Sequence, residues 1–532
     1  MNGFNPFKWM AAVAIAGLTM NVTAQSSFGE DCGCPPLASR TTVNFSTLAD
    51  AGGEMSTQTL TCNNIYVLGD GTGPAPDRYY VGNNVDLTIE PGTVIKAPVS
   101  SGADAAALIV ARGGQLWADG LDCCPIIFTS VEDPLDGTYS MNNRGRWGSL
   151  IVLGRATNNL VLALNGNPPA SDGLCVADGV GRIEGLVPNE SRNWCGGTDD
   201  DDNSGILRYV SLRHGGANIG ANNEINGLTL GSVGRGTTID YVEVISNDDD
   251  GFEMFGGTVD LKHCAAYFCN DDYFDWDWGW RGRGQYWYGV QLPINVGGGI
   301  AAAQGDEGFE LDNDDQNTNL APFADPTVYN ATMIGRGANS GMEFKEGSRG
   351  YVANSIFCNT QRGVTLISNA GDTGYPANQN SFFQWQNGAL EINNCSFDGL
   401  TGGLLFENGA LAGAGSLAAF AGDGNALSAG IIDFTMLMAN NNAVSNGIDP
   451  VPSASAAFTP ERAPLDGFFE PVKFKGAFKP GAAPWTSGWS VSELVGFDNS
   501  VTSCDEDVDK DGDVDVDDFL QLIGVFNTTC GN

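Results

Sequence analysis

The feature that most constrains the fold is a repeat of short apolar runs, each followed by a segment rich in Gly, Asn and Asp. The first four runs begin at Leu87, Leu108, Ile126 and Leu150. Runs of this length with many β-branched side chains are typical of strands. A helical period is hard to find before residue 515. Short strands at this spacing favour a β solenoid, in which each coil buries its inner face against neighbouring coils.

The repeat is sharpest in the middle of the chain. A shift of 22 residues places Ile239 on Leu261 and Phe252 on Phe274, and a looser copy lies 32 residues upstream of residue 239. The sequence Gly-Phe-Glu-Met at 251–254 recurs in related form at 308–311 and 341–344. Since strand side chains alternate between faces, we expect one face of each repeat to be apolar and the Glu to lie on the other.

Several segments resemble known families. Leu87–Lys96, Leu108–Leu116 and Pro125–Ser130 look like segments of right-handed parallel β-helix proteins of secreted bacterial origin. Arg146–Gly154 and Gly279–Trp287 resemble a large, poorly characterised set of bacterial surface proteins of that type. The resemblance covers about residues 40 to 490. It implies an all-β fold, a right-handed parallel β-helix, but no particular activity, because this fold carries lyases, hydrolases, adhesins and inert stalks.

The first 24 residues have the pattern of a secretory signal peptide. Lys8 supplies the positive charge, Trp9–Met20 is a short apolar stretch, and Val22–Ala24 is a small-residue cleavage site. The apolar stretch is shorter than the roughly 20 residues that a membrane helix needs. We therefore expect a secreted, extracellular or cell-surface protein without a membrane span.

The rest of the chain divides into three predicted parts. Residues 25–464 form the β-helix, with loop insertions at 156–205 and 281–304. Residues 465–500 lose the repeat and bring aromatic residues back, so they are interpreted as a cap of the solenoid and a linker. Residues 501–532 form a small C-terminal module.

Thirteen cysteines in a secreted chain predict disulfides, and the odd number leaves at least one thiol free or intermolecular. Cys504 and Cys530 bracket the C-terminal module and are expected to pair. Other pairings considered are Cys175 with Cys195, and Cys62 with either Cys32 or Cys34.

The strongest chemical motif is an acidic loop in the C-terminal module. An EF-hand type calcium loop needs oxygen ligands at positions 1, 3, 5, 9 and 12 and Gly at position 6, and position 7 binds through its backbone carbonyl. The sequence has Gly512 at position 6, and the predicted ligands are Asp507, Asp509, Asp511, Asp513, Asp515 and Asp518. The alternative is a solvated acidic tail.

This module resembles a dockerin repeat, which implies calcium as cofactor and a protein partner. A full dockerin carries two such loops, whereas one is visible here. With Cys504 and Cys530 closing it, the unit looks like a calcium- and disulfide-stabilised terminal module.

A second acidic cluster lies in the middle of the chain. Stacked coils would bring Asp249 close to Asp271 and Asp250 close to Asp272. Like charges at that distance are costly unless a cation lies between them, so these four residues are a possible second calcium site. The alternative is solvated turns whose Asp side chains cap the backbone.

Aromatic and basic residues are interleaved with this acidic cluster. They are a possible platform on which sugar rings stack, with the arginines contacting hydroxyls or carboxylates; the candidates are Trp276, Trp278, Trp280, Arg281, Arg283 and Trp287. The alternative is packing in the core, which is favoured for at least half of these aromatic residues because large aromatic side chains are mostly buried.

The charge balance excludes one class of partner. The chain has 64 acidic against 25 basic residues, a net charge of −39, and nucleic-acid binding needs a basic surface. We expect a non-catalytic calcium-binding surface protein that binds a polysaccharide or cell-surface glycan. The alternatives are a calcium-dependent polysaccharide lyase or glycoside hydrolase, and a structural or docking component tethered through the C-terminal module.

Overall fold

The fold is described from a computed structural model of the chain. The described residues are 29–69, 77–102, 105–160, 180–183, 186–187, 190–218, 225–291, 294–296, 299–301, 305–313, 321–368, 380–432, 448–452 and 459–494. The C-terminal module lies outside them. None of the helices in the described parts is long and apolar enough to cross a membrane.

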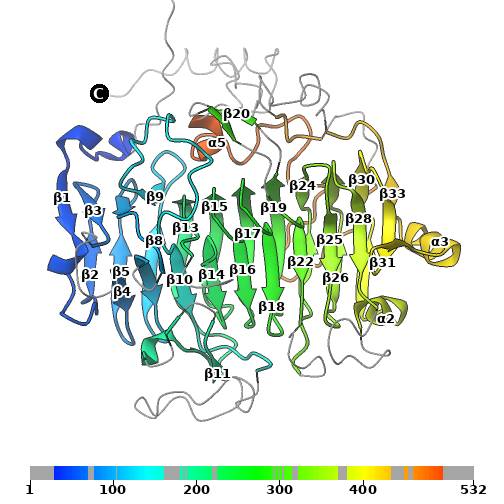
Figure 1. Cartoon of the computed structure of the whole chain (residues 1–532), viewed down its shortest axis with the longest axis horizontal. Coiled ribbons are helices and arrows are strands. Elements are labelled where there is room, and N and C mark those ends of the chain that lie inside the picture. The colour runs from blue at the N-terminus through cyan, green and yellow to red at the C-terminus, as the bar shows by residue number, and fades with distance from the viewer. Residues whose placement is uncertain are drawn as a thin grey trace, which may run out of the picture.

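Three columns of short parallel strands stack along one axis and form a β-helix (Figure 1). The first column is an 11-stranded sheet, here called sheet 1. It consists of β4 (Arg78–Val81), β7 (Ala107–Val110), β10 (Leu150–Leu153), β14 (Leu228–Gly231), β16 (Phe252–Phe255), β18 (Phe274–Asp277), β22 (Phe309–Leu311), β25 (Ser340–Phe344), β28 (Arg362–Leu366), β31 (Gly403–Glu407) and the antiparallel β32 (Ala410–Leu411).

The other two columns belong to an 18-stranded sheet, here called sheet 2. One column contains β2 (Gln58–Leu60), β5 (Asp86–Ile89), β8 (Gln115–Asp119), β23 (Thr327–Tyr329), β26 (Gly350–Ala353) and β29 (Leu390–Asn393). The other contains β1 (Thr41–Asn44), β3 (Asn64–Val67), β6 (Val94–Ala97), β9 (Ile126–Ser130), β24 (Thr332–Ile334), β27 (Ile356–Cys358), β30 (Ser396–Asp398) and β33 (Ala426–Leu427). Four long strands run through both columns: β13 (Gly205–Arg213), β15 (Thr238–Ile245), β17 (Asp260–Tyr267) and β19 (Arg283–Val290).

Short elements complete the described chain. Two antiparallel pairs lie in the predicted loop insertions, β11 (Val180–Gly181) with β12 (Cys195–Gly196) and β20 (Ile294–Val296) with β21 (Gly299–Ala301). The helical segments are η1 (Glu30–Cys32), η2 (Leu37–Ser39), η3 (Phe45–Thr47), η5 (Ser191–Asn193), α2 (Ser381–Gln386), α3 (Ala414–Gly422) and α5 (Val491–Leu494). The second insertion was predicted to start at residue 281, which is too early, because residues 283–290 form β19.

The stacking confirms the predicted fold class and register. Ile239 pairs with Leu261 and Phe252 with Phe274, as the 22-residue repeat predicts. The offset of 32 residues corresponds to the pairing of β13 with β15. The inward side chains form one continuous core, in which the ring of Phe274 stacks on that of Trp287 at 4.4 Å.

The corner between the two columns of sheet 2 is a column of residues with positive φ. Four aromatic residues occupy this corner in successive coils, and their rings stack at 4.5, 4.1 and 4.9 Å: Tyr209, Tyr241, His263 and Tyr286. Asn330, Asn354 and Asn394 occupy it farther along the chain. Asn tolerates this backbone conformation well. His263 also lies 2.8 Å from the carboxylate of Asp240, so its role is structural.

The segment 461–494, here called the strap, corrects the prediction of a cap at 465–500. It runs back along the outside of sheet 2 instead of covering the end of the solenoid. Glu461 accepts a hydrogen bond from Tyr351, Glu470 pairs with Lys262, and the backbone N–H of Val491 donates to Glu243. Figure 1 shows α5, at the end of the strap, beside the middle of the stack. The repeat is absent here because the strap forms no coil.

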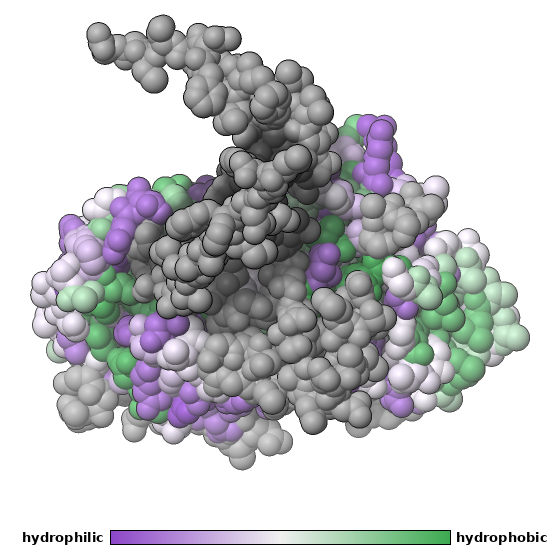
Figure 2. All heavy atoms as spheres, turned by 90° about the horizontal axis from the view of Figure 1, so that it is seen from above, coloured by the Kyte–Doolittle hydropathy of each residue, from purple (hydrophilic) through white to green (hydrophobic). Residues whose placement is uncertain are grey.

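Helix α3 covers the last coil in place of the predicted cap. Its Phe420 is fully buried and packs against Phe397 of β30. Beside it Leu411 and Leu427 remain 57% and 64% exposed, on the last strands of their columns. Figure 2 shows hydrophobic side chains gathered at this end of the molecule.

Two disulfides hold the N-terminal segment. Cys34 pairs with Cys62, which confirms one of the two predicted alternatives, and Cys32 pairs with Cys124. Cys195 is buried, and its predicted partner Cys175 lies outside the described residues.

Candidate functional site

The outer face of sheet 1 carries four carboxylates in consecutive coils. They are paired in register across the parallel strands β16, β18, β22 and β25, and are here called the carboxylate column: Glu253, Asp275, Glu310 and Glu343. Their strand neighbours Phe252 and Met254 point into the core, so alternation turns the carboxylates outward. Parallel strands lie about 4.8 Å apart, which places like charges next to each other along the column.

A second set of acidic residues precedes the same strands. Asp250 accepts a hydrogen bond of 2.9 Å from the backbone N–H of Asp272, and Asp272 accepts one of 2.5 Å from that of Glu307. These bonds explain why Asp recurs at matched turn positions, since each carboxylate caps the backbone of the next coil. The cap leaves a carboxylate oxygen on each side chain for other contacts.

Two groups of carboxylates come together where these sets meet. The oxygens of Asp249, Asp250 and Asp271 lie within 4.8 Å of one another, and so do those of Asp250, Glu253 and Asp275. The predicted quartet is therefore brought together in part. Asp272, which follows Asp271 in the same turn, caps the backbone of Glu307.

The second group, here called the buried triad (Asp250, Glu253 and Asp275), is secluded from water. Its members are 7%, 6% and 8% exposed. The side-chain amide of Asn226 donates to Glu253, whereas Oδ1 of Asp275 has no hydrogen-bond partner. Burial, and then the surrounding carboxylates, raise the pKa of Asp250 and Asp275 well above its usual value. Such a group must hold either protons or a cation.

The far end of the carboxylate column is neutralised by a lysine. Lys345 forms ion pairs with Glu310 and, at 3.4 Å, with Asp312. Burial alone would lower the pKa of Lys345, but the charges of Asp312 and Glu310 outweigh burial and raise it. Lys345 is therefore protonated at neutral pH. Burial and the charge of Glu343 raise the pKa of Glu307 to about 9, so this side chain is a neutral acid at neutral pH.

These pKa values predict how stability depends on pH. A carboxyl group whose pKa is raised in the folded chain stabilises it at low pH, and this contribution is lost as pH rises through the folded pKa. In EDTA the melting temperature should therefore fall from about pH 5 to pH 9. Saturating calcium should flatten this decrease, because a cation binds the ionised carboxylates. Scanning calorimetry in both conditions measures the two slopes, and Asp275→Asn should have the smaller slope in EDTA. Equal slopes would contradict cation binding at the buried triad.

The predicted aromatic platform is largely core. Trp276, Trp280 and Trp287 have no exposed surface, and their indole N–H groups donate to Ser348, to the carbonyl of Val259 and to that of Leu261. These three tryptophans cannot stack on a sugar ring, which corrects the prediction. Trp278 alone is half-buried, in a turn with positive φ, and its ring lies 4.7 Å from that of Phe255.

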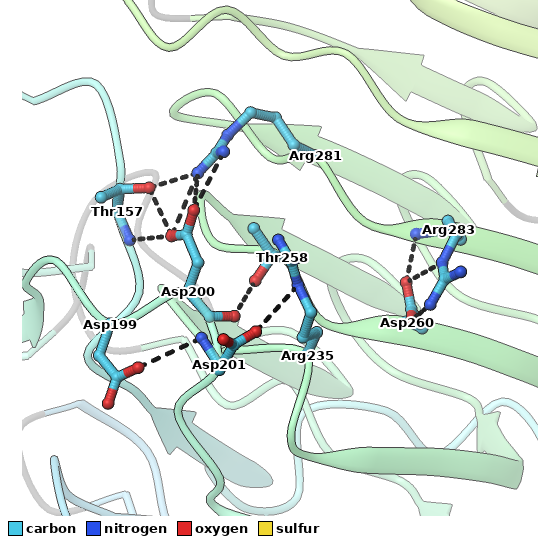
Figure 3. A network of polar contacts seen from close by, with 9 residues as sticks. All are labelled: Thr157, Asp199, Asp200, Asp201, Arg235, Thr258, Asp260, Arg281 and Arg283. Atoms are coloured by element: carbon cyan, nitrogen blue, oxygen red, sulfur yellow. Dashed lines mark hydrogen bonds and ion pairs between the residues drawn. The ribbon is translucent and has the colours of Figure 1, made fainter. Parts of the chain in front are cut away.

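The two predicted ligand arginines are held by carboxylates of the same chain. Arg281 pairs with Asp200 at 3.2 Å. Arg283 pairs with Asp260 at 2.5 Å and with Asp466 of the strap at 2.8 Å. Figure 3 shows the guanidinium group of Arg281 turned toward Asp200 and that of Arg283 turned toward Asp260. The contacts correct the prediction that the arginines bind a ligand, since each is already occupied in a structural ion pair.

A polar pocket lies beside the ion pairs of Figure 3. Its volume is about 420 Å³. The described lining residues are Asn84, Asp86, Gly113, Gln115, Arg155, Asp199, Asp201, Asp202 and Asn203. Among them Arg155 is the basic residue. Asp201 also pairs with Arg235 at 3.5 Å. Polar side chains of this kind suit a ligand that is rich in hydroxyl groups.

The sequence alone did not assign the carboxylate column as a site. Other predicted site residues lie outside the part of the chain that the structure describes. The recurrence of Glu at 253, 310 and 343 was visible as a repeat, but a repeat alone does not assign a site. The predicted calcium ligands Asp507, Asp509, Asp511, Asp513, Asp515 and Asp518, and the cysteines Cys504 and Cys530, lie outside the described residues.

Comparison with known proteins identifies a family. Neither curated proteins nor solved structures give a match. The family model of the pectate-lyase-like beta-helix domain matches residues 55–411, which is more than half of the chain. This range begins at the first coils and ends at β32, and it contains the carboxylate column. The chain therefore belongs to the pectate-lyase-like beta-helix domain family.

Proposed function

We propose that the chain is a secreted calcium-binding β-helix protein that binds carbohydrate through the outer face of sheet 1, without catalysis. The family supports a carbohydrate-related role. The two disulfides support an extracellular location, because disulfides persist in oxidising compartments. No step of the proposed function depends on the C-terminal loop, which is predicted as a separate calcium site.

The observation that carries the calcium proposal is the buried triad. Three carboxylates within 4.8 Å are a costly arrangement unless they hold protons or a cation, and a cation would also serve Oδ1 of Asp275, which lacks a donor. Calcium prefers carboxylate and carbonyl oxygens and tolerates irregular geometry. Asp249 and Asp271 would extend the ligand set through Asp250, which belongs to both groups.

A second candidate function is glycoside hydrolysis. Glu307 is protonated at neutral pH, and burial and the charge of Glu343 raise its pKa to about 9. Glu310 and Glu343 are direct neighbours in register, and retaining glycosidases hold their two carboxyl groups about 5–5.5 Å apart. A lyase is less well supported, since Lys345 is protonated and held by Glu310 and Asp312, and a protonated lysine cannot act as a base.

Calcium titration by calorimetry tests the proposal. The full chain with Asp507→Ala and Asp518→Ala, which removes ligands of the predicted C-terminal loop, should still bind calcium. Adding Asp275→Asn should weaken the remaining binding at least tenfold, about 1.4 kcal/mol. Asp423→Asn, at the exposed end of α3, is the matched control and should change nothing. Complete loss of binding with the loop variants alone would refute a cation at the triad.

Carbohydrate binding is tested next, on polysaccharides in calcium and in EDTA. Binding in calcium without new reducing or unsaturated ends supports the proposed function. Reducing ends that disappear in Glu307→Gln would support the hydrolase instead.

A further inference from the structure

Three sulfur atoms meet at the N-terminal end of the β-helix. Cys32 and Cys124 form a disulfide, and the free thiol of Cys123 lies 3.6 Å from Sγ of Cys32 and 3.5 Å from Sγ of Cys124. Cys123 is exposed, whereas Cys124 is buried. A free thiol is thus in contact with both sulfurs of a disulfide in the same chain.

The local fold places this thiol at the tip of a tight turn. Leu121 and Cys124 form an antiparallel bridge, with both backbone hydrogen bonds between them. Asp122 and Cys123 form the tip between β8 and β9, where the N–H of Cys123 donates to the carboxylate of Asp122. The side chain of Cys123 is free to rotate, because it projects from the tip into solvent.

We propose that Cys32, Cys123 and Cys124 form a thiol–disulfide exchange site. The Cys123 thiolate attacks Sγ of Cys32, a Cys123–Cys32 bond forms, the Cys32–Cys124 bond breaks, and Cys124 leaves as a thiolate that takes up a proton. The number of disulfides is unchanged, so the step needs no external oxidant or reductant. The free thiol passes from an exposed to a buried position.

The direction of attack follows from geometry. The nearly equal distances place the Cys123 sulfur beside the disulfide, and a rotation of its exposed side chain is needed to bring it in line. Attack on Cys124 would instead join adjacent residues, whose Cα atoms are about 3.8 Å apart, closer than the roughly 4.4–6.8 Å that disulfides span. Cys32 is therefore the sulfur that is attacked.

The surroundings set the rate of exchange. Partial burial, and then the charges of Asp122 and Asp31, raise the pKa of the Cys123 thiol. Because the thiolate is the nucleophile, exchange is slow at neutral pH and faster in mild base. The external reagents that this site would react with are disulfides. They can reach the exposed Cys123, whereas Cys124 is buried and protected from them.

Peptide mapping of the full wild-type chain tests the proposal. After incubation at pH 8.5, the protein is quenched in acid, unfolded, alkylated and fragmented, so that the alkyl group locates the free thiol. We expect the label on Cys123 in part of the molecules and on Cys124 in the rest. Label on Cys123 alone would overturn the proposal, whatever the variants show.

Two serine variants give a matched pair. Cys124→Ser should form the Cys32–Cys123 disulfide, and Cys123→Ser should keep Cys32–Cys124 with no exposed thiol. Both should retain the Cys34–Cys62 disulfide, which reports correct folding of this end. A free Cys32 in Cys124→Ser, with Cys34–Cys62 intact, would also contradict the exchange.

Discussion

Replacing Trp287 with alanine should destabilise the β-helix by about 3–5 kcal/mol. The side chain has no exposed surface and lies between the rings of Phe274, at 4.4 Å, and Trp280, at 6.1 Å. Its indole N–H donates to the carbonyl of Leu261 at 3.1 Å, so the variant loses a hydrogen bond and gains a cavity. Denaturant unfolding followed by circular dichroism measures the loss.

The matched control for Trp287 is an exposed apolar residue of the same solenoid. Leu427→Ala should change the free energy of unfolding by less than about 0.5 kcal/mol, because Leu427 is 64% exposed. If Trp287→Ala were as stable as the wild type and lost only carbohydrate binding, the tryptophan would belong to a ligand platform and not to the core.

The second large effect is expected from Glu243→Ala, at about 3–5 kcal/mol. Glu243 is fully buried in β15 and accepts hydrogen bonds from Ser211, Ser490 and the backbone of Val491. Burial raises its pKa, and the charge of Arg213 opposes that shift. Removing the carboxylate leaves Arg213 buried without this charge partner and detaches the end of the strap. Thermal unfolding gives the size of the effect.

Tryptophan fluorescence shows whether the stability lost in Glu243→Ala comes from release of the strap. Trp485 and Trp489 lie edge-on over the ring of Tyr241, so release of the strap should shift their fluorescence to the red. Glu470→Ala is the matched control on the same segment, because its ion pair with Lys262 is exposed on the Glu470 side and should contribute at most about 1 kcal/mol. A Glu243→Ala variant with an unshifted spectrum would show that the strap is held elsewhere.

The register of the coils was predictable from sequence because a solenoid repeats itself locally. Each coil places equivalent residues in contact with those of its neighbours. Residues that match in the sequence repeat, such as Phe252 and Phe274, are therefore paired in the structure. The same logic found Asp249, Asp250 and Asp271, which meet within 4.8 Å.

What sequence could not supply were contacts outside the repeat. The strap touches coils about 80 to 250 residues away, for example Val491 with Glu243, and no spacing encodes such contacts. The pairing of Cys32 with Cys124 is equally remote. Strand alternation alone would place Trp276 and Trp278 on one face. However, β18 ends at Asp277 and the chain turns, so only Trp276 enters the core.

The strap also changes how the molecule should respond to force. In a simple solenoid each coil holds only its neighbours, so it can fray coil by coil from an end. The strap instead ties β26 and β23, through Glu461, to β15, through Val491, so the middle coils cannot separate until it is released. A pulling force applied at residue 494 would break the contacts of the strap one after another, beginning with the hydrogen bond of Val491 to Glu243. The hydrogen bonds to the buried carboxylate of Glu243 therefore determine the force at which the strap begins to detach.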